Sequence, residues 1–276
     1  MSAAKNDPNE YLRRLGESGE GPYDIARAGL MLAALDHAGR SLVPYESHLA
    51  EVADASRQSL RLIYRAEEGA HVLSSLMAGR FGYGGDRIAY DDPQNADLIS
   101  VIDRRRGLPV ALGILYIHAA RAGGFEACGL NVPGHFLLRI SVKGGIALID
   151  AFNGGAIVDH ERLGGPPAMA AAAPGEPSFG EPVSDCDVLM RLQNNVKRRA
   201  IEAGDRLRAL EIAKRMVLIA PRRPELWMDL ARLHEAGGSL GAAKTAYEAC
   251  LALAKSGAAL HNEAALGLAG LKRRLN

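Results

Sequence analysis

The sequence predicts an α+β protein, in which a helical N-terminal region leads into a core of a helix and an antiparallel sheet, and an all-helical tail follows. Three observations carry this prediction. Apolar residues recur at helical spacing over much of residues 23–122. Two runs of β-type sequence, 135–142 and 146–152, then stand on either side of a Lys-Gly-Gly turn. From Val188 onward the sequence is helical again and repeats itself.

Composition and charge are those of a soluble globular protein. The chain has 276 residues, 48% of them hydrophobic, and 33 Lys and Arg against 32 Asp and Glu give a formal charge of +1. Such a chain is not expected to bind nucleic acid or an acidic membrane surface through its charge. The longest apolar run, Leu108–Ala120, is shorter than the ~20 residues of a membrane span, and Met1–Gly19 lacks the apolar segment of a signal peptide. We therefore expect a cytoplasmic protein.

The three cysteines, Cys128, Cys186 and Cys250, stand far apart and are odd in number. The sequence has no CxxC pair and no cluster of Cys and His, so it predicts neither a disulfide framework nor a zinc site. We interpret Cys128 and Cys250 as packing residues. No metal and no cofactor is expected.

The N-terminal elements follow from apolar spacing and from turn residues. Residues 1–21 are polar and are interpreted as a flexible tail. Helices are expected at Tyr23–Ala38, Pro44–Ala55 and Ser59–Met77 (the last as one helix or two), with turns at Gly79–Gly85 and Asp91–Asn95 and a short helix from Asp97 to Asp103.

The next helix has clear signals at both ends. Pro109 suits the first helical position, where its missing N–H costs nothing. The glycine pair Gly123-Gly124 ends the helix. A short strand at Ala127–Leu130 precedes the hairpin.

The loop of the hairpin decides whether His135 of its first strand lies near Asp150 of its second. A four-residue loop at Ser141–Gly144 puts the two residues directly opposite each other. A loop at Val142–Gly145 puts them on the same face one diagonal step apart, ~7–8 Å between backbone positions. Three-residue loops put them on opposite faces. The spacing leaves these arrangements open.

The tail has the period of a tetratricopeptide repeat. Ala209 and Ala243 are 34 residues apart, and Trp227 and Tyr247 stand where that repeat favours aromatic residues. A generic helical hairpin is the alternative. The Pro- and Gly-rich stretch before this tail divides the chain into residues 22–163, a connector at 164–187 and a helical region at 188–276.

A helix start followed by a His strand and an Asp strand is an arrangement with known chemistry. A cysteine at the helix start would be the nucleophile, the histidine its base and the aspartate the group that orients the histidine. His135 and Asp150 suit the last two roles. The alternative is that His135 is a hydrogen-bonded histidine that holds the core together.

The chain resembles the transglutaminase-like superfamily, whose core runs from Gly-x-Cys at a helix start to a His strand and an Asp strand. More narrowly, it resembles the SirB family of bacterial proteins, which joins such a core to a tetratricopeptide-like tail. The resemblance covers roughly residues 23–275. It is carried by the motifs Gly82–Asp86, Tyr90–Asn95, Val101–Leu112, Pro133–Phe136 and Ile149–Gly155.

The resemblance implies a papain-like fold and also one departure from it. When Gly107 is laid on the superfamily's glycine, the nucleophile position falls on Pro109, which has no nucleophilic atom. His135 and Asp150 then stand at the base and orienting positions of a vestigial or rearranged site. We expect a non-catalytic module that binds a protein or peptide partner, with the repeat tail as its interaction surface. The alternative is a hydrolase or acyl-transfer enzyme with a rearranged site around His135 and Asp150.

Three further polar residues are candidates for a rim that binds an anion or another ligand: Arg104, Arg106 and Asn153. The start of the helix at Gly107 would favour an anion nearby. The alternative for the arginines is a solvated face or ion pairs with Asp103 or Asp91, and Asn153 can bond to backbone in its own turn. The sequence leaves the oligomeric state and the partner's identity open.

Overall fold

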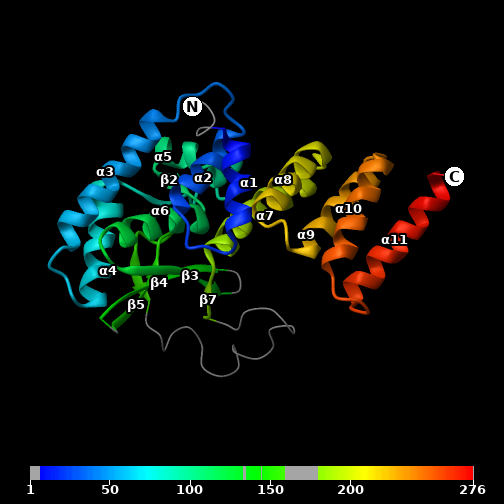
Figure 1. Cartoon of the computed structure of the whole chain (residues 1–276). Helices are drawn as coiled ribbons and strands as arrows, with labels where there is room; N and C mark the ends of the chain where they lie inside the picture. The colour runs from blue at the N-terminus through cyan, green and yellow to red at the C-terminus, as the bar shows by residue number, and fades with distance from the viewer. Residues whose placement is uncertain (1–6, 133–134, 144, 159–179, 276) are drawn as a thin grey trace. The chain divides into compact units, whose positions relative to one another are not determined.

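The computed structural model describes residues 7–132, 135–143, 145–158 and 180–275 (Figure 1). The chain divides into two compact units. The core unit is Gly21–Leu192, and the repeat unit is Gln193–Asn276 together with Met1–Glu20. The predicted combination of helices and an antiparallel sheet, followed by a helical tail, is confirmed. Among the described residues, no helix is both long enough and apolar enough to cross a membrane.

The core unit combines helices with a five-stranded antiparallel sheet of order β6-β5-β4-β3-β7. Strands β1 and β2 form a separate parallel pair. In chain order the elements are α2 (Ile25–Ala34), α3 (Val43–Leu60), α4 (Ala66–Ser74), a π-helix (Ser75–Arg80), β1 (Gly84–Gly85), a 3₁₀ helix (Pro93–Ala96), α5 (Leu98–Arg104), β2 (Arg106–Gly107), α6 (Pro109–Ala122), β3 (Glu126–Val132), β4 (His135–Val142), β5 (Gly145–Asp150), β6 (Ala156–Val158), β7 (Pro182–Val183) and the first part of α7 (Asp185–Glu202).

Helix α6 lies at the centre of the core unit. It begins at Pro109 as predicted, and ten of its 14 residues are buried. A helix that is apolar on every side must be covered all round. Helices α2, α3 and α5 pack on it, and so do strands β3 and β4 (Figure 1). Gly113 permits the close approach of β4, because a Cβ there would lie 2.3 Å from the ring of Phe136.

Most core elements appear where the sequence places them, with differences in their bounds. Helix α3 runs to Leu60, past the predicted end at Ala55, and the helix expected from Ser59 is broken before α4 begins at Ala66, where Arg65 has an extended backbone. The connector expected at 164–187 is described only from residue 180 onward, and residues 164–179 lie outside the described part. In the described part of the connector, Pro182 and Val183 pair with β3 and so belong to the sheet. The core unit ends only at Leu192.

The repeat unit contains the rest of α7 with α8 (Arg206–Ile219), α9 (Pro224–Ala236), α10 (Leu240–Leu253) and α11 (Ala259–Leu275). Ala209 of α8 and Ala243 of α10 are fully buried, as their repeat positions require. The ring of Tyr247 packs on Gly267 of α11, where a Cβ would lie 2.6 Å from the ring. Small residues therefore let neighbouring helices approach closely.

The flexible tail expected at residues 1–21 contains a helix instead. Helix α1 (Pro8–Ser18) begins at an Asp7 cap and packs against α8 in the repeat unit. Leu12 and Leu15 are buried, and a Cβ on Gly16 would lie 2.2 Å from the carbonyl oxygen of Leu218. An isolated helix of this length is marginal in water, so this packing stabilises it. Its partner lies some 200 residues further along the chain, which is why the local sequence did not predict it.

We predict that Leu12→Ala destabilises the repeat unit by about 2–5 kcal/mol, since it removes a fully buried side chain between α1 and α8. Denaturant unfolding of the full chain measures the change, and hydrogen exchange should rise in α8. Arg14→Ala on the exposed side of α1 is the control and should change stability by less than about 0.5 kcal/mol. Equal stability of Leu12→Ala and wild type would contradict the packing.

Candidate functional site

The hairpin register brings His135 and Asp150 together. Val142 pairs with Gly145 and Leu138 with Ile149. Continued by one residue, this register sets Asp150 one diagonal step from His135 on the same face of the sheet. The Nε2 atom of His135 lies 2.8 Å from Oδ2 of Asp150. Of the arrangements that the spacing left open, the one with a loop at Val142–Gly145 is confirmed.

The Asp150 carboxylate is buried and accepts hydrogen bonds from four donors. Its Oδ1 accepts from the backbone N–H groups of Phe152, at 3.0 Å, and Asn153, at 3.1 Å. Its Oδ2 accepts from Nδ2 of Asn153 at 2.5 Å, in addition to His135. The carboxylate thus fixes the turn that follows β5 as well as the imidazole ring.

The His135 ring is held on one side and open to solvent on the other. Because Asp150 only accepts, Nε2 is the donor, and Nδ1 is then the ring nitrogen that can take up a proton. The side chain is 36% exposed. Its backbone carbonyl accepts from Nη2 of Arg191 on α7 at 2.5 Å. The geometry is that of an oriented base, and equally that of a histidine that ties β4 to β5.

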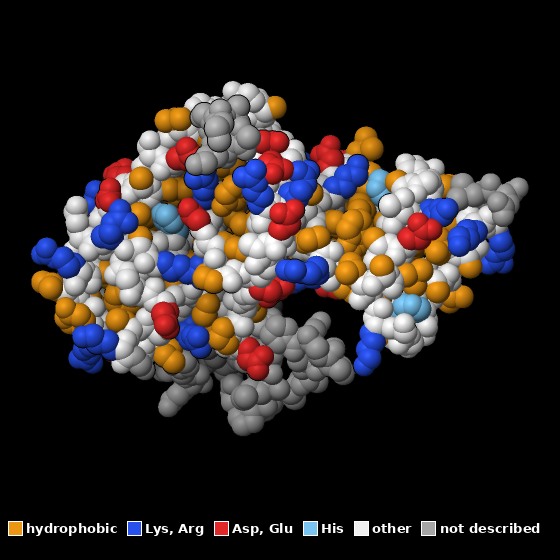
Figure 2. Space-filling model, viewed as in Figure 1, with side chains coloured by type: hydrophobic (Ala, Val, Ile, Leu, Met, Phe, Trp, Pro, Cys, Tyr) orange, Lys and Arg blue, Asp and Glu red, His pale blue; other side chains and the backbone are white. Residues whose placement is uncertain are grey.

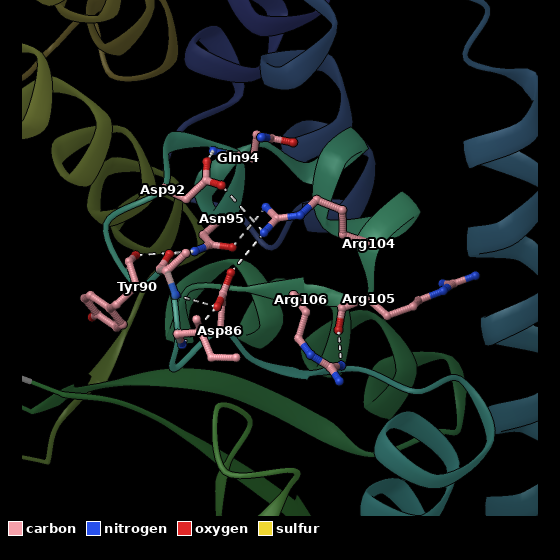
Figure 3. A network of polar contacts seen from close by, with 10 residues as sticks. Asp86, Tyr90, Asp92, Gln94, Asn95, Arg104, Arg105 and Arg106 are labelled. Atoms are coloured by element: carbon pink, nitrogen blue, oxygen red, sulfur yellow. Dashed lines mark hydrogen bonds and ion pairs between the residues drawn. The ribbon is translucent and has the colours of Figure 1, made fainter.

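Of the three rim candidates, the structure brings only Asn153 to this pair. Arg104 is engaged elsewhere, with Nη2 2.9 Å from Oδ2 of Asp86 and Nη1 3.2 Å from Oδ1 of Asn95 (Figure 3). Arg106 is exposed and donates to the backbone carbonyls of Gly82 and Arg105. The sequence suggested Asp103 or Asp91 as ion-pair partners of the arginines and did not indicate Asp86, although Asp86 closes the motif that begins at Gly82.

The comparisons with known proteins agree with both units. Residues 44–194 match the family described as the transglutaminase-like superfamily, which is more than half of the chain. The chain belongs to the transglutaminase-like superfamily. Residues 196–265 match the tetratricopeptide repeat. No solved structure is similar enough to the chain to count as a match.

Several curated proteins are similar to this transglutaminase-like chain. The UPF0162 protein of Xylella fastidiosa (strain Temecula1) is 33% identical over 155 residues, 54% of this chain and 55% of that protein. The UPF0162 protein of Vibrio cholerae is 34% identical over 104 residues, 37% of this chain and 38% of that protein. F-box only protein 21 of Mus musculus is 34% identical over 71 residues, 26% of this chain and 11% of that protein. The chain spans about half the length of the Xylella relatives.

Pro109, where the resemblance to the superfamily places the nucleophile, is the first residue of α6. Strand β2 leads into it, and Gly107 of β2 pairs with Gly85 of β1. The ring of Phe152 packs on Gly85, where a Cβ would lie 2.5 Å away. The start of α6 and the turn after Asp150 are therefore joined through β1 and an aromatic ring.

None of the three cysteines stands in for a nucleophile at Pro109. Cys186 and Cys250 are buried. Cys128 pairs with Arg139 on β4, four residues from the His135 level of the sheet, which is about 13 Å along the strand. Burial also raises the pKa of the Cys128 thiol, which disfavours the reactive thiolate. Among the described residues, no three His, Cys, Asp or Glu side chains are grouped to hold a metal ion.

A second polar cluster surrounds Arg105, which ends α5 in the left-handed region at φ 58°. Its guanidinium lies over the Tyr83 ring, 4.8 Å from the centroid, with Nη1 2.6 Å from Nε2 of His48. Nε2 of His48 also lies 2.7 Å from the Tyr83 hydroxyl. Burial raises the pKa of Tyr83 to about 12. Burial first, and then the Arg105 charge, lower the pKa of His48. His48 is therefore held neutral beside a cation.

We predict that Asp150→Asn destabilises the core unit by about 2–4 kcal/mol, because the amide nitrogen would face donors in a buried site. Urea unfolding of the full chain measures the change. Asp54→Asn, at an exposed position on α3, is the control and should stay within about 0.5 kcal/mol of wild type. A similarly small change for Asp150→Asn would show that these hydrogen bonds do not stabilise the turn.

We predict that acidification destabilises the core unit through His48. As the pH falls through 6.5, the ordinary pKa of histidine, the unfolded chain binds a proton that native His48 resists. His48→Gln should therefore show a smaller loss of unfolding free energy than wild type between about pH 7.5 and 5.5. His234 in the repeat unit, whose pKa burial also lowers, stays in both proteins. Identical pH profiles would contradict the prediction.

Proposed function

We propose that this protein is a non-catalytic transglutaminase-like protein that binds a protein or peptide, with the repeat unit as an interaction surface. Pro109 is the observation that carries the proposal. A proline at the first position of α6 offers neither a nucleophilic atom nor an N–H group. The thiols of the three cysteines are buried or distant from His135, as described above.

The contacts of Asp150 and Arg104 support this proposal. The Asp150 carboxylate holds the turn after β5, and Arg104 joins α5 to Asp86 and Asn95. The contacts of both residues are thus explained by the stability of the fold, without a role in any reaction. A protein that uses this fold for recognition needs the same contacts, since they fix the shape of its surface.

The charge of the repeat unit favours an acidic protein as the partner. Residues 193–276 contain 15 Lys and Arg against eight Asp and Glu, and residues 1–20 add three against four. Six of these carboxylates, those of Glu202, Glu211, Asp229, Glu235, Glu248 and Glu263, pair with a cation of the same unit. The excess of positive charge therefore remains for a partner. Figure 2 shows Lys and Arg side chains near the C-terminal end, where Lys272, Arg273 and Arg274 form the last turn of α11.

We further propose that the chain is a member of the SirB family and acts in the bacterial cytoplasm without a cofactor. The similar UPF0162 proteins come from bacteria, which supports membership of this bacterial family.

The alternative is a hydrolase or acyl-transfer enzyme that uses His135 and Asp150 on water or on a substrate nucleophile. One observation favours it. The imidazole is oriented through Nε2 and is 36% exposed, as a general base requires.

The two functions differ in a direct assay. The full chain is incubated with a glutamine-containing peptide, with and without hydroxylamine, and ammonia and hydroxamate are measured. We expect neither product above the buffer control, for wild type and His135→Ala alike. Turnover that His135→Ala abolishes and His37→Ala leaves intact would establish the enzyme instead.

A further inference from the structure

The loop between β1 and the 3₁₀ helix exposes apolar side chains. Ile88 is 101% exposed and Tyr90 is 43% exposed, and Arg87 and Ala89 between them are exposed as well. The side chain of Ile88 is therefore fully exposed to solvent and contributes nothing to the core. A single exposed isoleucine is ordinary on a protein surface. This one stands out because its backbone is held rigidly.

Buried polar side chains hold this loop from beneath (Figure 3). Oδ1 of Asp86 accepts from the N–H groups of Ile88, at 3.2 Å, and Ala89, at 2.9 Å. Nδ2 of Asn95 donates to the Ala89 carbonyl at 2.6 Å. Arg104 bonds to both Asp86 and Asn95. Asp86 and Asn95 are buried, so the fold accepts the cost of desolvating polar groups in order to fix this loop.

The loop lies against the turn that carries Asp150. Nη2 of Arg87 donates to Oδ1 of Asn153, whose Nδ2 donates to Asp150. The Tyr90 ring meets the Phe152 ring edge to face, with centroids 5.8 Å apart. Figure 3 shows the Tyr90 side chain pointing away from the Asp86 and Arg104 network. The exposed residues Arg87, Ile88, Tyr90 and Asn153 thus lie together, and we call them the 87–90 surface.

We propose that the 87–90 surface docks a peptide segment of a protein partner in which an apolar side chain stands next to a carboxylate. The proposal rests on the proposed function, since it adds a binding surface on the core unit to the interaction surface of the repeat unit. Ile88 and Tyr90 offer apolar contact at small entropic cost, because their backbone is fixed before binding. Arg87 contacts a neutral amide oxygen, so its charge attracts a carboxylate, which a guanidinium can bind through two hydrogen bonds.

Selection from a random peptide library displayed on phage, with the immobilised full chain as bait, tests the proposal. We expect selected peptides to share an Asp or Glu beside an aliphatic or aromatic residue. Synthetic versions of these peptides then give dissociation constants by fluorescence anisotropy. Ile88→Ser should weaken binding about tenfold or more, the effect of removing a buried aliphatic contact. Arg87→Gln should abolish the preference for a Glu peptide over its Gln counterpart.

Leu62→Ser is the matched control, because Leu62 is 68% exposed in the core unit and outside the 87–90 surface. It should leave binding unchanged. Peptides without an acidic residue, no enrichment at all, or equal effects of Ile88→Ser and Leu62→Ser would each overturn the proposal. If the chain dimerises in sedimentation and Ile88→Ser makes it monomeric, a second copy is the occupant and the proposal is also overturned. Peptide binding that bypasses Ile88 refutes only the 87–90 surface, whereas turnover in the glutamine assay refutes the proposed function itself.

Discussion

The burial of most of α6 is the constraint on which the rest of the core unit depends. Because ten of its 14 residues are buried, the chain has to supply helices for some of its faces and a sheet for the others. The end of α6 leads directly into β3, whose first residue, Glu126, pairs with Ser141 near the end of β4. The start of α6 and the start of β4 therefore lie at the same end of the sheet. Pro109 and His135 come to that end for reasons of packing alone.

Two buried carboxylates organise the chain around this end. Asp150 fixes the turn after β5, and Asp86 fixes the loop that carries Ile88. The loop and the turn then meet through Arg87 and Asn153. Each carboxylate accepts several donors, so the cost of its burial is offset by hydrogen bonds. Asp150 and Asp86, polar residues of the sequence motifs, thus have a structural role: their carboxylates stabilise irregular backbone.

Local sequence signals predicted α6 and the hairpin. Elements that depend on contacts between distant parts of the chain could not be predicted in this way. Pro109 and the Gly123-Gly124 pair mark the ends of α6 through effects within one turn. The hairpin loop had open registers, because residue types alone do not decide whether Val142 or Ser141 closes it. The sequence did not predict helix α1, since its stability comes from α8, nor the pairing of Arg104 with Asp86, which lies 18 residues earlier in an irregular loop. The sequence named His135 and Asp150 as candidates but left their register open, and the hairpin of the structure brings Nε2 of His135 within 2.8 Å of Oδ2 of Asp150.

The formal charge of +1 conceals a division that only the structure defines. The core unit, residues 21–192, carries 15 Lys and Arg against 20 Asp and Glu, whereas the repeat unit, residues 1–20 and 193–276, carries 18 against 12. Electrostatic attraction has to be judged for each unit, since screening confines it to about 10 Å. A basic repeat unit attracts either acidic protein segments or nucleic acid. Its three aromatic side chains, Tyr11, Trp227 and Tyr247, are buried or half-buried and offer no platform for stacked bases, whereas Ile201, Leu207 and Leu266 are exposed. These exposed aliphatic groups, together with the excess of cations, support the proposed acidic protein partner of the repeat unit over a nucleic acid.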